Sequence, residues 1–255
     1  MHLILDIGNS NVTIGFFDEN VLLNVVSFSY SRSFKQNIFE QILEQLLSDK
    51  NFTECILASV ASDMTQIISD AVTSVCNVRP IEINHDMKFG FKIKAKKPRR
   101  IGIDRIANIC AAGQIYSEHV IVVDFGTATT FDIMDDEKSF IGGLIMPGIG
   151  TQLKSLTENT SDLPKVELSE LEKVKSTINT DTVKAMLSGI VKGHAYAVEG
   201  LLTDCIKELK TKPVIIATGG HALLMQNYMK KYKFDTILPD LTLKGLQRIY
   251  ELNSD

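Results

Sequence analysis

Among its 255 residues the chain has no tryptophan, no cysteine cluster and no long uncharged apolar run. No segment approaches the ~18 to 20 apolar residues that a helix needs to span a bilayer, so we expect no membrane-spanning helix. The four cysteines lie far apart and show neither a CxxC pair nor the Cys/His spacing of a zinc site. We therefore interpret them as reduced thiols of a cytoplasmic protein. The 44% hydrophobic and 23% charged residues exclude collagen-like, low-complexity and disordered classes.

A strong basic charge and a catalytic histidine pattern are also absent. Lysine plus arginine number 27 against 31 for aspartate plus glutamate, which gives a net charge of −4. A duplex-binding protein needs a basic face that releases counterions, so we expect no nucleic-acid partner. The five histidines show no HxxxH or HExxH spacing, which argues against a zinc hydrolase. The first residues lack the basic stretch and cleavage site of a signal peptide.

One pattern occurs twice, with Asp6 aligned on Asp124. Leu3–Gly8 is an apolar run that ends in Asp-x-Gly and is followed by a polar turn and a β-branched strand. Val120–Gly126 has the same order and is followed by threonines and another apolar strand. Each copy precedes a helical periodicity and then a second buried strand, namely Asn37–Leu47 with Cys55–Val60 and Thr182–Lys210 with Val214–Ala217. These repeats predict an internal duplication at the scale of a domain.

The duplication predicts an α/β fold with two lobes and a cleft between them. Strands that alternate with helices favour parallel pairing with helices on both faces of each sheet. We expect two domains, residues 1–117 and residues 118–255. Glu158–Thr180 is polar and predicts an excursion from the core, and Leu241–Leu246 begins a short terminal helix.

Both Asp-x-Gly turns have the chemistry of a polyphosphate site. Asp6–Asn11 has the residues that such a site needs: a glycine that lets the backbone approach, turn N–H groups that can point at phosphate oxygens, and an aspartate that can hold a hydrated magnesium ion. Taken alone, turn composition is the simpler explanation of these residues. Their recurrence in Asp124–Thr130 favours a paired phosphate clamp. The glycines between Gly142 and Gly150 do not form a Walker loop.

The segment Gly102–Asn108 places a carboxylate at the start of a predicted helix. An aspartate near a helix N-terminus is a routine cap, and the neighbouring Arg105 is then an ordinary solvated charge. Alternatively, Asp104 is a base that accepts a proton from a substrate hydroxyl, and Arg105 holds an anionic group with its bidentate guanidinium. The segment by itself favours the cap, and both interpretations stay open.

Three further features bear on substrates and partners. Lys92–Arg100 is rich in lysine and arginine, which is typical of a solvated strand face or loop but also suits attraction of an anionic substrate. Gly193 and Gly200 within the predicted long helix indicate close packing against a neighbour, such as a second subunit. Thr218–Gly220 at a strand end suits close approach of an adenine or ribose, or a plain strand-to-helix turn.

Together, six segments in register make the chain resemble the type III pantothenate kinases of the acetate kinase, sugar kinase and actin superfamily. The motifs are Asp6–Ser10, Gly102–Arg105, Asp124–Thr129, Gly142–Gly148, Thr182–Gly189 and Asp240–Leu246. The resemblance implies duplicated ribonuclease H-like, actin-like domains with mixed sheets flanked by helices. It also implies ATP-dependent phosphorylation of pantothenate to 4′-phosphopantothenate, the first step of coenzyme A biosynthesis.

The same resemblance implies roles for individual residues. Asp104 is the general base, Thr127 contacts ATP, and Asp124 binds a monovalent cation, either potassium or ammonium. The residues that contact pantothenate are Gly102, Ile103, Arg105 and Thr182. The first turn holds the ATP phosphates, with magnesium at its aspartate, through Asp6, Ile7, Gly8, Asn9, Ser10, Asn11, Val12 and Thr13. The family works as a homodimer, with the substrate pocket completed across the interface.

Three positions depart from the family pattern. Where family members often have Arg-Tyr-Asp-Asn-Pro, this chain has Lys94–Pro98, so Ala95 replaces a tyrosine that lines the substrate pocket. Ser10 replaces a threonine but keeps the hydroxyl, and Asp181 replaces an asparagine and adds negative charge near an anionic substrate. Ala95 leaves open a kinase of another small hydroxy acid. The other alternative is a non-enzymatic regulatory factor on the same scaffold, which only the basic run Lys92–Arg100 favours.

Overall fold

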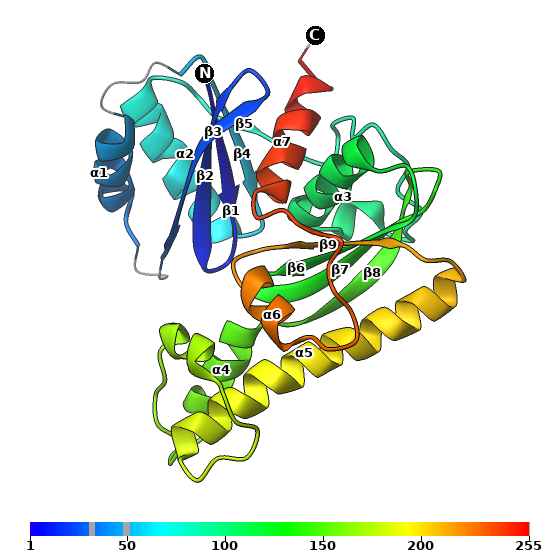
Figure 1. Ribbon diagram of the computed structural model, residues 1–255. Helices are drawn as coiled ribbons and strands as arrows, with labels where there is room; N and C mark the ends of the chain where they lie inside the picture. The colour runs from blue at the N-terminus through cyan, green and yellow to red at the C-terminus, as the bar shows by residue number, and fades with distance from the viewer. Residues whose placement is uncertain (31–33, 48–51, 255) are drawn as a thin grey trace. The chain divides into compact units, whose positions relative to one another are not determined.

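The computed structural model describes residues 1–30, 34–47 and 52–254, and the chain divides into two compact units (Figure 1). Unit 1 comprises Met1–Ile115 together with Asp240–Asp255, and unit 2 comprises Tyr116–Pro239. Each unit contains one five-stranded sheet. Within the described ranges, no helix combines the length and the apolar character needed to cross a membrane.

The sheet of unit 1 has the strand order β3-β2-β1-β4-β5. Its strands are β1 (His2–Ile7), β2 (Asn11–Asp18), β3 (Val21–Ser29), β4 (Glu54–Ser59) and β5 (Ile81–Glu82). The first three strands form an antiparallel meander, whereas β1 pairs in parallel with β4 and β4 with β5. The helices of this unit are α1 (Gln36–Leu47), α2 (Ser62–Cys76), the short η1 (Pro98–Arg100), α3 (Ile103–Ile115) and α7 (Leu241–Glu251).

The sheet of unit 2 has the order β10-β9-β6-β7-β8. Its strands are β6 (Val120–Phe125), β7 (Ala128–Met134), β8 (Phe140–Pro147), β9 (Val214–Thr218) and β10 (Thr236–Ile237). Its helices are α4 (Ile149–Glu158), the short η2 (Leu168–Lys173), α5 (Thr182–Leu209) and α6 (Ala222–Tyr228). The predicted excursion Glu158–Thr180 contains η2 and is anchored by Leu171, which is buried in the core of the unit.

The two sheets share one topology, which confirms the predicted duplication. Read from the meander edge, β3-β2-β1-β4-β5 corresponds to β8-β7-β6-β9-β10, with the same antiparallel and parallel pairs. Asp6 and Asp124 occupy equivalent positions near the carboxyl ends of the central strands β1 and β6. The meander in each copy makes the sheets mixed, and the parallel pairing expected from helix–strand alternation is limited to the other half.

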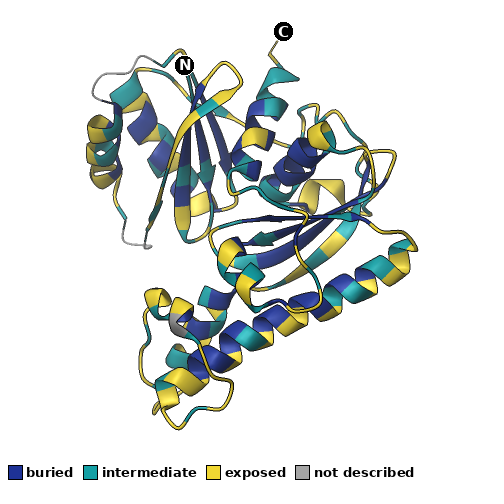
Figure 2. Ribbon diagram, viewed as in Figure 1, coloured by how far each residue is buried: buried dark blue, intermediate teal, exposed yellow. Residues whose placement is uncertain are grey.

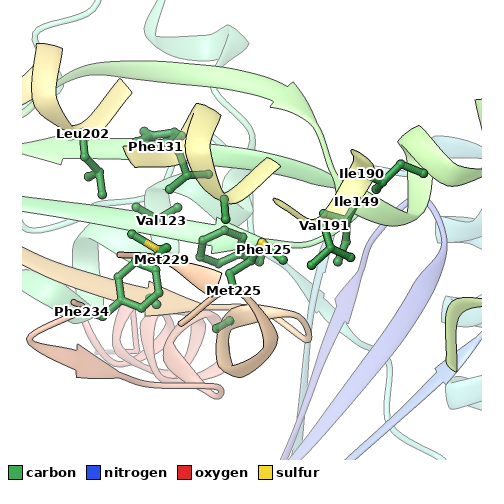
Figure 3. Close-up of a cluster of buried hydrophobic side chains, with 14 of the residues drawn as sticks. Val123, Phe125, Phe131, Ile149, Ile190, Val191, Leu202, Met225, Met229 and Phe234 are labelled. Carbon is green, nitrogen blue, oxygen red and sulfur yellow. The ribbon is translucent and has the colours of Figure 1, made fainter. Parts of the chain in front are cut away.

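Each unit has its own hydrophobic core. In unit 1, β1 and β2 pack with Phe39 of α1 and Ile68 of α2. In unit 2, Phe125 and Phe131 of the sheet pack with side chains of α5 such as Val191 (Figure 3). The 28-residue helix α5 buries one side against this core and leaves the other exposed (Figure 2). The sheet edges that carry the two Asp-x-Gly turns are therefore held by separate cores.

The C-terminal helix belongs to unit 1, whereas the expected division at residue 118 assigned it to the second domain. Helix α7 packs along α3. The Thr242 hydroxyl donates to the buried Asn108 Oδ1 at 2.8 Å. A Cβ on Gly245 would overlap the backbone of Ala107, so the two helices touch without a side chain between them. Because α7 follows β10 as α3 follows β5, the two equivalent helices of the duplication form this pair.

Candidate active site

The first turn that is predicted to bind phosphate follows β1, as the sequence indicates. Asp6 is half-buried near the end of β1, and the Gly8 N–H donates to the Asn11 carbonyl at 2.9 Å, which closes the turn. Tyr30, the residue after β3, donates its N–H to the Ser10 carbonyl at 3.0 Å and its hydroxyl to the Gly8 carbonyl. The turn is therefore held in shape by contacts within the protein.

Asp104 lies in the first turn of α3, but it is not the helix cap. It is the second helical residue, and its Oδ1 accepts a hydrogen bond from the Arg105 N–H at 2.8 Å. A cap residue precedes the helix and accepts from an N–H two or three residues ahead. Asp181 shows that arrangement at α5, where its Oδ1 accepts from the Lys184 N–H at 2.9 Å. The structure therefore disfavours the capping interpretation of Asp104.

The environment of Asp104 strengthens this residue as a base. Its side chain is half-buried, and burial raises its pKa above the ordinary aspartate value. The backbone N–H and the guanidinium of Arg105 act in the opposite direction without cancelling the effect of burial. A carboxylate with a raised pKa holds a proton more tightly, which is what a general base for a hydroxyl needs.

Unit 1 brings the first turn and Asp104 to one edge of its sheet. Strands β1 and β4 run parallel, so their carboxyl ends meet at the same edge, where ligands bind in open α/β sheets. Just after β4, the Val60 N–H donates to the Ile7 carbonyl at 3.0 Å. A Cβ on Gly102 would lie 3.6 Å from the Val60 side chain and would overlap the Asp104 carboxylate. These contacts place Asp104 beside the strand ends that carry Asp6, and they explain the glycine two residues before Asp104.

In unit 2, Asp124 lies near the carboxyl end of β6, between β7 and β9. Its register partners are Thr130 across the antiparallel pair and Thr218 across the parallel pair. Gly219 has a positive φ of 84°, and a Cβ there would crowd the Asp124 Oδ1 and the backbone of Phe125. The Thr218 hydroxyl is buried and has no hydrogen-bond partner among the described residues. This edge therefore combines a half-buried carboxylate with a buried hydroxyl on the adjacent strand.

The second turn that is predicted to bind phosphate, Gly126–Thr127, is held against the start of α4. The Gly126 N–H donates to the Ala128 carbonyl at 3.1 Å. The Thr127 carbonyl accepts from the Gly148 N–H at 3.0 Å and from the Thr151 hydroxyl at 2.6 Å. A Cβ on Gly148 would overlap the carbonyl oxygens of the turn, so only glycine permits this approach. The glycine-rich segment that ends at Gly148 therefore supports the Gly126–Thr127 turn.

Thr182, the predicted substrate contact of α5, is exposed at the first position of that helix. A cavity of about 320 Å³ lies next to it within unit 2 and is lined by its neighbours Asp181 and Val183 and by Val174 and Lys175 of the preceding segment. A second cavity, of about 310 Å³, lies in unit 1 between α3 and α7 and is lined by none of the predicted site residues.

The predicted site residues are distributed over both units. Asp6 and Asp104 share one sheet edge in unit 1, and Asp124 and Thr127 share the equivalent edge in unit 2. Thr182 lies on a separate element of unit 2, at the start of α5. That all three carboxylates converge on one nucleotide stays a prediction.

The residues that support the two turns carried no signal in the sequence. Tyr30, Val60 and Thr151 each bond to a turn or strand end from a segment distant in sequence. In contrast, the glycines Gly102 and Gly148 belong to the recognised motifs, and the structure supplies the steric reason for each. Local motifs in the sequence therefore predict the turns, whereas most of the side chains that hold these turns come from distant segments.

The basic run Lys92–Arg100 is a solvated segment of unit 1. Its lysines and arginines are exposed, and Ile93 and Ala95 between them are half-buried. The Arg99 guanidinium forms an ion pair with Asp86 at 2.5 Å. The exposure of these side chains agrees with a solvated face, and the attraction of an anionic substrate stays a prediction.

Relatives of the chain were identified by comparison with known proteins. Residues 2–204 match the family model described as type III pantothenate kinase. The chain belongs to the type III pantothenate kinase family. A type III pantothenate kinase from Dictyoglomus turgidum is 36% identical to it over 258 residues, an alignment that covers 99% of this chain and 100% of that protein.

Solved structures share the fold of this pantothenate kinase family member. The ethanolamine utilization protein EutJ from Carboxydothermus hydrogenoformans has a TM-score of 0.59 at 13% identity and covers 97% of this chain and 89% of its own. A protein from Campylobacter jejuni named for the Baf family of transcriptional activators has a TM-score of 0.57 at 21% identity, covering 98% and 97%. At these identities the likeness establishes the fold alone, and it confirms the expected duplicated actin-like α/β architecture.

Proposed function

We propose that this protein transfers the γ-phosphoryl group of ATP to the primary hydroxyl of pantothenate, the reaction expected of its family and the first step of coenzyme A biosynthesis. Phosphoryl transfer requires alignment, charge neutralisation and a base for the acceptor hydroxyl. The observation that carries the proposal is the position of Asp104. Its carboxylate is half-buried and does not occupy the cap position of α3, and it lies beside the strand ends that bear the Asp6 turn.

In this mechanism Asp104 accepts the proton of the pantothenate hydroxyl as the oxygen attacks the γ-phosphorus. Burial raises the affinity of the carboxylate for that proton. Arg105 follows Asp104 in α3 and is proposed to hold the anionic end of pantothenate with its guanidinium. Ile103, Gly102 and Thr182 are proposed to complete the substrate contacts, with glycine leaving room for the Asp104 carboxylate.

The first turn is proposed to hold the ATP phosphates and a magnesium ion. Asp6 is a single half-buried carboxylate next to a turn of backbone N–H groups, which fits an ion bound through one carboxylate, phosphate oxygens and water. No group of three His, Cys, Asp or Glu side chains in the described part of the chain could hold a metal by itself. When bound, magnesium neutralises charge on the transferred phosphates. Thr127 is exposed at the second turn and is proposed to contact ATP there.

Asp124 is proposed to bind a monovalent cation, either potassium or ammonium. Such an ion takes oxygen ligands, and the edge of β6 and β9 offers a carboxylate and the buried, unpartnered Thr218 hydroxyl. A buried hydroxyl without a partner carries a free-energy cost that a bound ion would remove. The donor set of this edge therefore fits the cation.

A coupled assay for ADP release tests both parts of the proposal. With ATP, magnesium and pantothenate, we expect ADP release that requires pantothenate and that potassium or ammonium stimulates relative to sodium. Asp124→Asn should lose the stimulation because a neutral amide binds cations more weakly than a carboxylate. Asp136→Asn, an exposed carboxylate in the β7–β8 turn of the same unit, is the matched control and should retain it.

Each arm of this assay can reject one element. Absence of pantothenate-dependent ADP release overturns the proposed function. Release only with another acceptor from a panel of small hydroxy acids would favour the alternative that Ala95 leaves open. Equal rates of ADP release in potassium and sodium would reject Asp124 as a monovalent-cation ligand but would leave the proposed kinase activity unchanged.

We also propose that the protein is a homodimer formed through α5. The exposed side of this helix carries a stripe of small residues, namely Ala185, Gly189, Gly193, Ala197 and Gly200. A Cβ added at Gly189, Gly193 or Gly200 would meet nothing within 4 Å, so the space beside these glycines is open. Small side chains let two helices approach closely, and a twofold axis would place the same stripe on both partners.

Light scattering on a gel-filtration column tests the dimer. Gly193→Arg should shift the wild-type dimer toward monomer, because a long charged side chain keeps the helices apart and is costly to bury. Gln66→Arg, at an exposed position of α2, is the control and should leave the mass unchanged. A monomeric wild-type protein, or a Gly193→Arg dimer of full stability, would remove α5 as the interface.

A further inference from the structure

One buried histidine connects three elements around the second phosphate turn. His194, in the middle of α5, is 2% exposed. Its Nε2 lies 3.0 Å from the Thr129 hydroxyl, and its Nδ1 lies 2.7 Å from the Gln152 Nε2. Its ring meets the Phe125 ring edge-on, with centroids 6.2 Å apart. The imidazole therefore touches β6, β7 and α4 at once.

The hydrogen bonds assign the tautomer of this imidazole. The Gln152 amide nitrogen also donates to the Pro147 carbonyl at 2.9 Å, so this atom is the NH₂ group and acts as a donor. The His194 Nδ1 must then accept, which leaves the proton on Nε2, where it is donated to the Thr129 hydroxyl. Burial lowers the pKa of His194 to about 4, with a smaller contribution from nearby His221, so the neutral form persists at physiological pH.

The three contacts enclose the turn that carries Thr127. Phe125 and Thr129 are directly opposed in the β6–β7 register and close this turn on its two sides. Figure 3 shows Phe125 within the core of unit 2, and this residue is 1% exposed. Gln152 lies in the first turn of α4, the same turn that bonds to the Thr127 carbonyl through its neighbours. His194 thus holds both strands of the turn and the helix beneath it.

We propose that His194 is a positioning residue for ATP, which sets the Gly126–Thr127 turn in the geometry that receives the nucleotide phosphates. It makes no contact with ATP and acts through Thr129, Phe125 and Gln152. This inference rests on the proposed function, because it assumes that the turn is an ATP site. A phenylalanine in its place keeps the ring volume and the edge contact but leaves the Thr129 and Gln152 polar groups without their buried partner.

The test is ATP binding, measured directly by calorimetry, together with steady-state kinetics. His194→Phe should weaken ATP binding about tenfold and raise KM for ATP by a similar factor, with KM for pantothenate nearly unchanged. His194→Gln keeps one donor and one acceptor and should restore most of the affinity. The control is Thr203→Val. Thr203 lies on α5 like His194 but remote from the turn, and its replacement removes a side-chain hydrogen bond to Tyr232, so this variant should bind ATP like the wild type.

Two further variants keep the inference open to rejection if His194→Phe does not fold. Thr129→Val and Gln152→Met remove the same hydrogen bonds from the partner side and should show the same selective loss of ATP affinity. The double variant His194→Phe/Thr129→Val should bind no worse than the weaker single variant, because both remove one shared bond. Unchanged ATP affinity in the folded variants would overturn the inference alone, whereas a wild-type protein that binds no ATP would overturn the proposed function with it.

Discussion

Replacing Asp104 by asparagine is expected to lower kcat by about 10²- to 10⁴-fold, the range that a positioned general base contributes. Asparagine keeps the size of the side chain and an oxygen for the Arg105 N–H, which Asp104 now bonds at 2.8 Å, but it does not accept the substrate proton. Asp104 is not assigned to ATP, so the affinity for ATP should stay close to that of the wild type. Steady-state kinetics and direct ATP binding on the same preparation separate the two effects.

The stability of variants at position 104 distinguishes a base from a helix cap. Burial raises the pKa of Asp104, so the folded protein binds this proton more tightly than the unfolded chain does. The pKa of Asp104 is therefore higher in the folded protein than in the unfolded chain. As the pH rises from the lower to the higher of these two pKa values, the contribution of Asp104 to the free energy of unfolding falls, so ionised Asp104 opposes folding. Asp104→Ala should thus lose little or no stability at neutral pH, whereas loss of a cap costs about 0.5 to 2 kcal/mol.

Asp63 provides the matched control for the kinetic prediction. It is the second residue of α2, as Asp104 is of α3, but it is exposed. Asp63→Asn should leave kcat unchanged within experimental error.

The pH dependence of the wild-type rate gives a second measurement. Because Asp104 must be ionised to act as a base and its pKa is raised, the rate should begin to fall on acidification at a pH above the ordinary range of an aspartate. Full activity of Asp104→Asn would reject Asp104 as the base, whatever the profile shows.

Gly245→Ala is expected to destabilise the protein by about 1 to 3 kcal/mol, the usual cost of overpacking a tight interface. At this position a Cβ would overlap the backbone of Ala107, and backbone in the middle of α3 cannot rotate away as a side chain can. The higher helix propensity of alanine, worth about 1 kcal/mol in its favour, offsets only part of this cost. Urea-induced unfolding monitored by circular dichroism gives the free energy of unfolding directly.

The neighbouring exposed residue of α7 serves as the control for this effect. Lys244→Ala removes only a surface ion pair with Asp240, at 2.8 Å, and should change the free energy of unfolding by less than about 1 kcal/mol. Because α3 carries Asp104, displacement of α3 in Gly245→Ala should also lower kcat more than Lys244→Ala does. A Gly245→Ala protein as stable as the wild type would show that the two helices separate at little cost.

The amino-acid sequence by itself determined the duplication, the two Asp-x-Gly turns and the family. These features are local: an apolar run, a glycine that permits a turn and a helical periodicity each depend on residues within a few positions of one another. Because the two copies repeat the same local order, the α/β class and the strands around Asp6 and Asp124 followed without any long-range contact. The proposed role of Asp104 as a base follows from its motif, whereas its position at the start of a predicted helix favours a cap.

Only the tertiary structure decided what holds these local elements in place. The pairing of α7 with α3 joins residues as far apart in the sequence as Asn108 and Thr242. The periodicity of a helix does not indicate which other element it packs against. The same is true of Tyr30 behind the first turn and His194 behind the second. Such contacts depend on which side chains meet after the sheets form. Short-range sequence patterns therefore specify the strands and turns. The side chains that hold the turns in place are specified by how distant segments fit together and become buried in the folded protein.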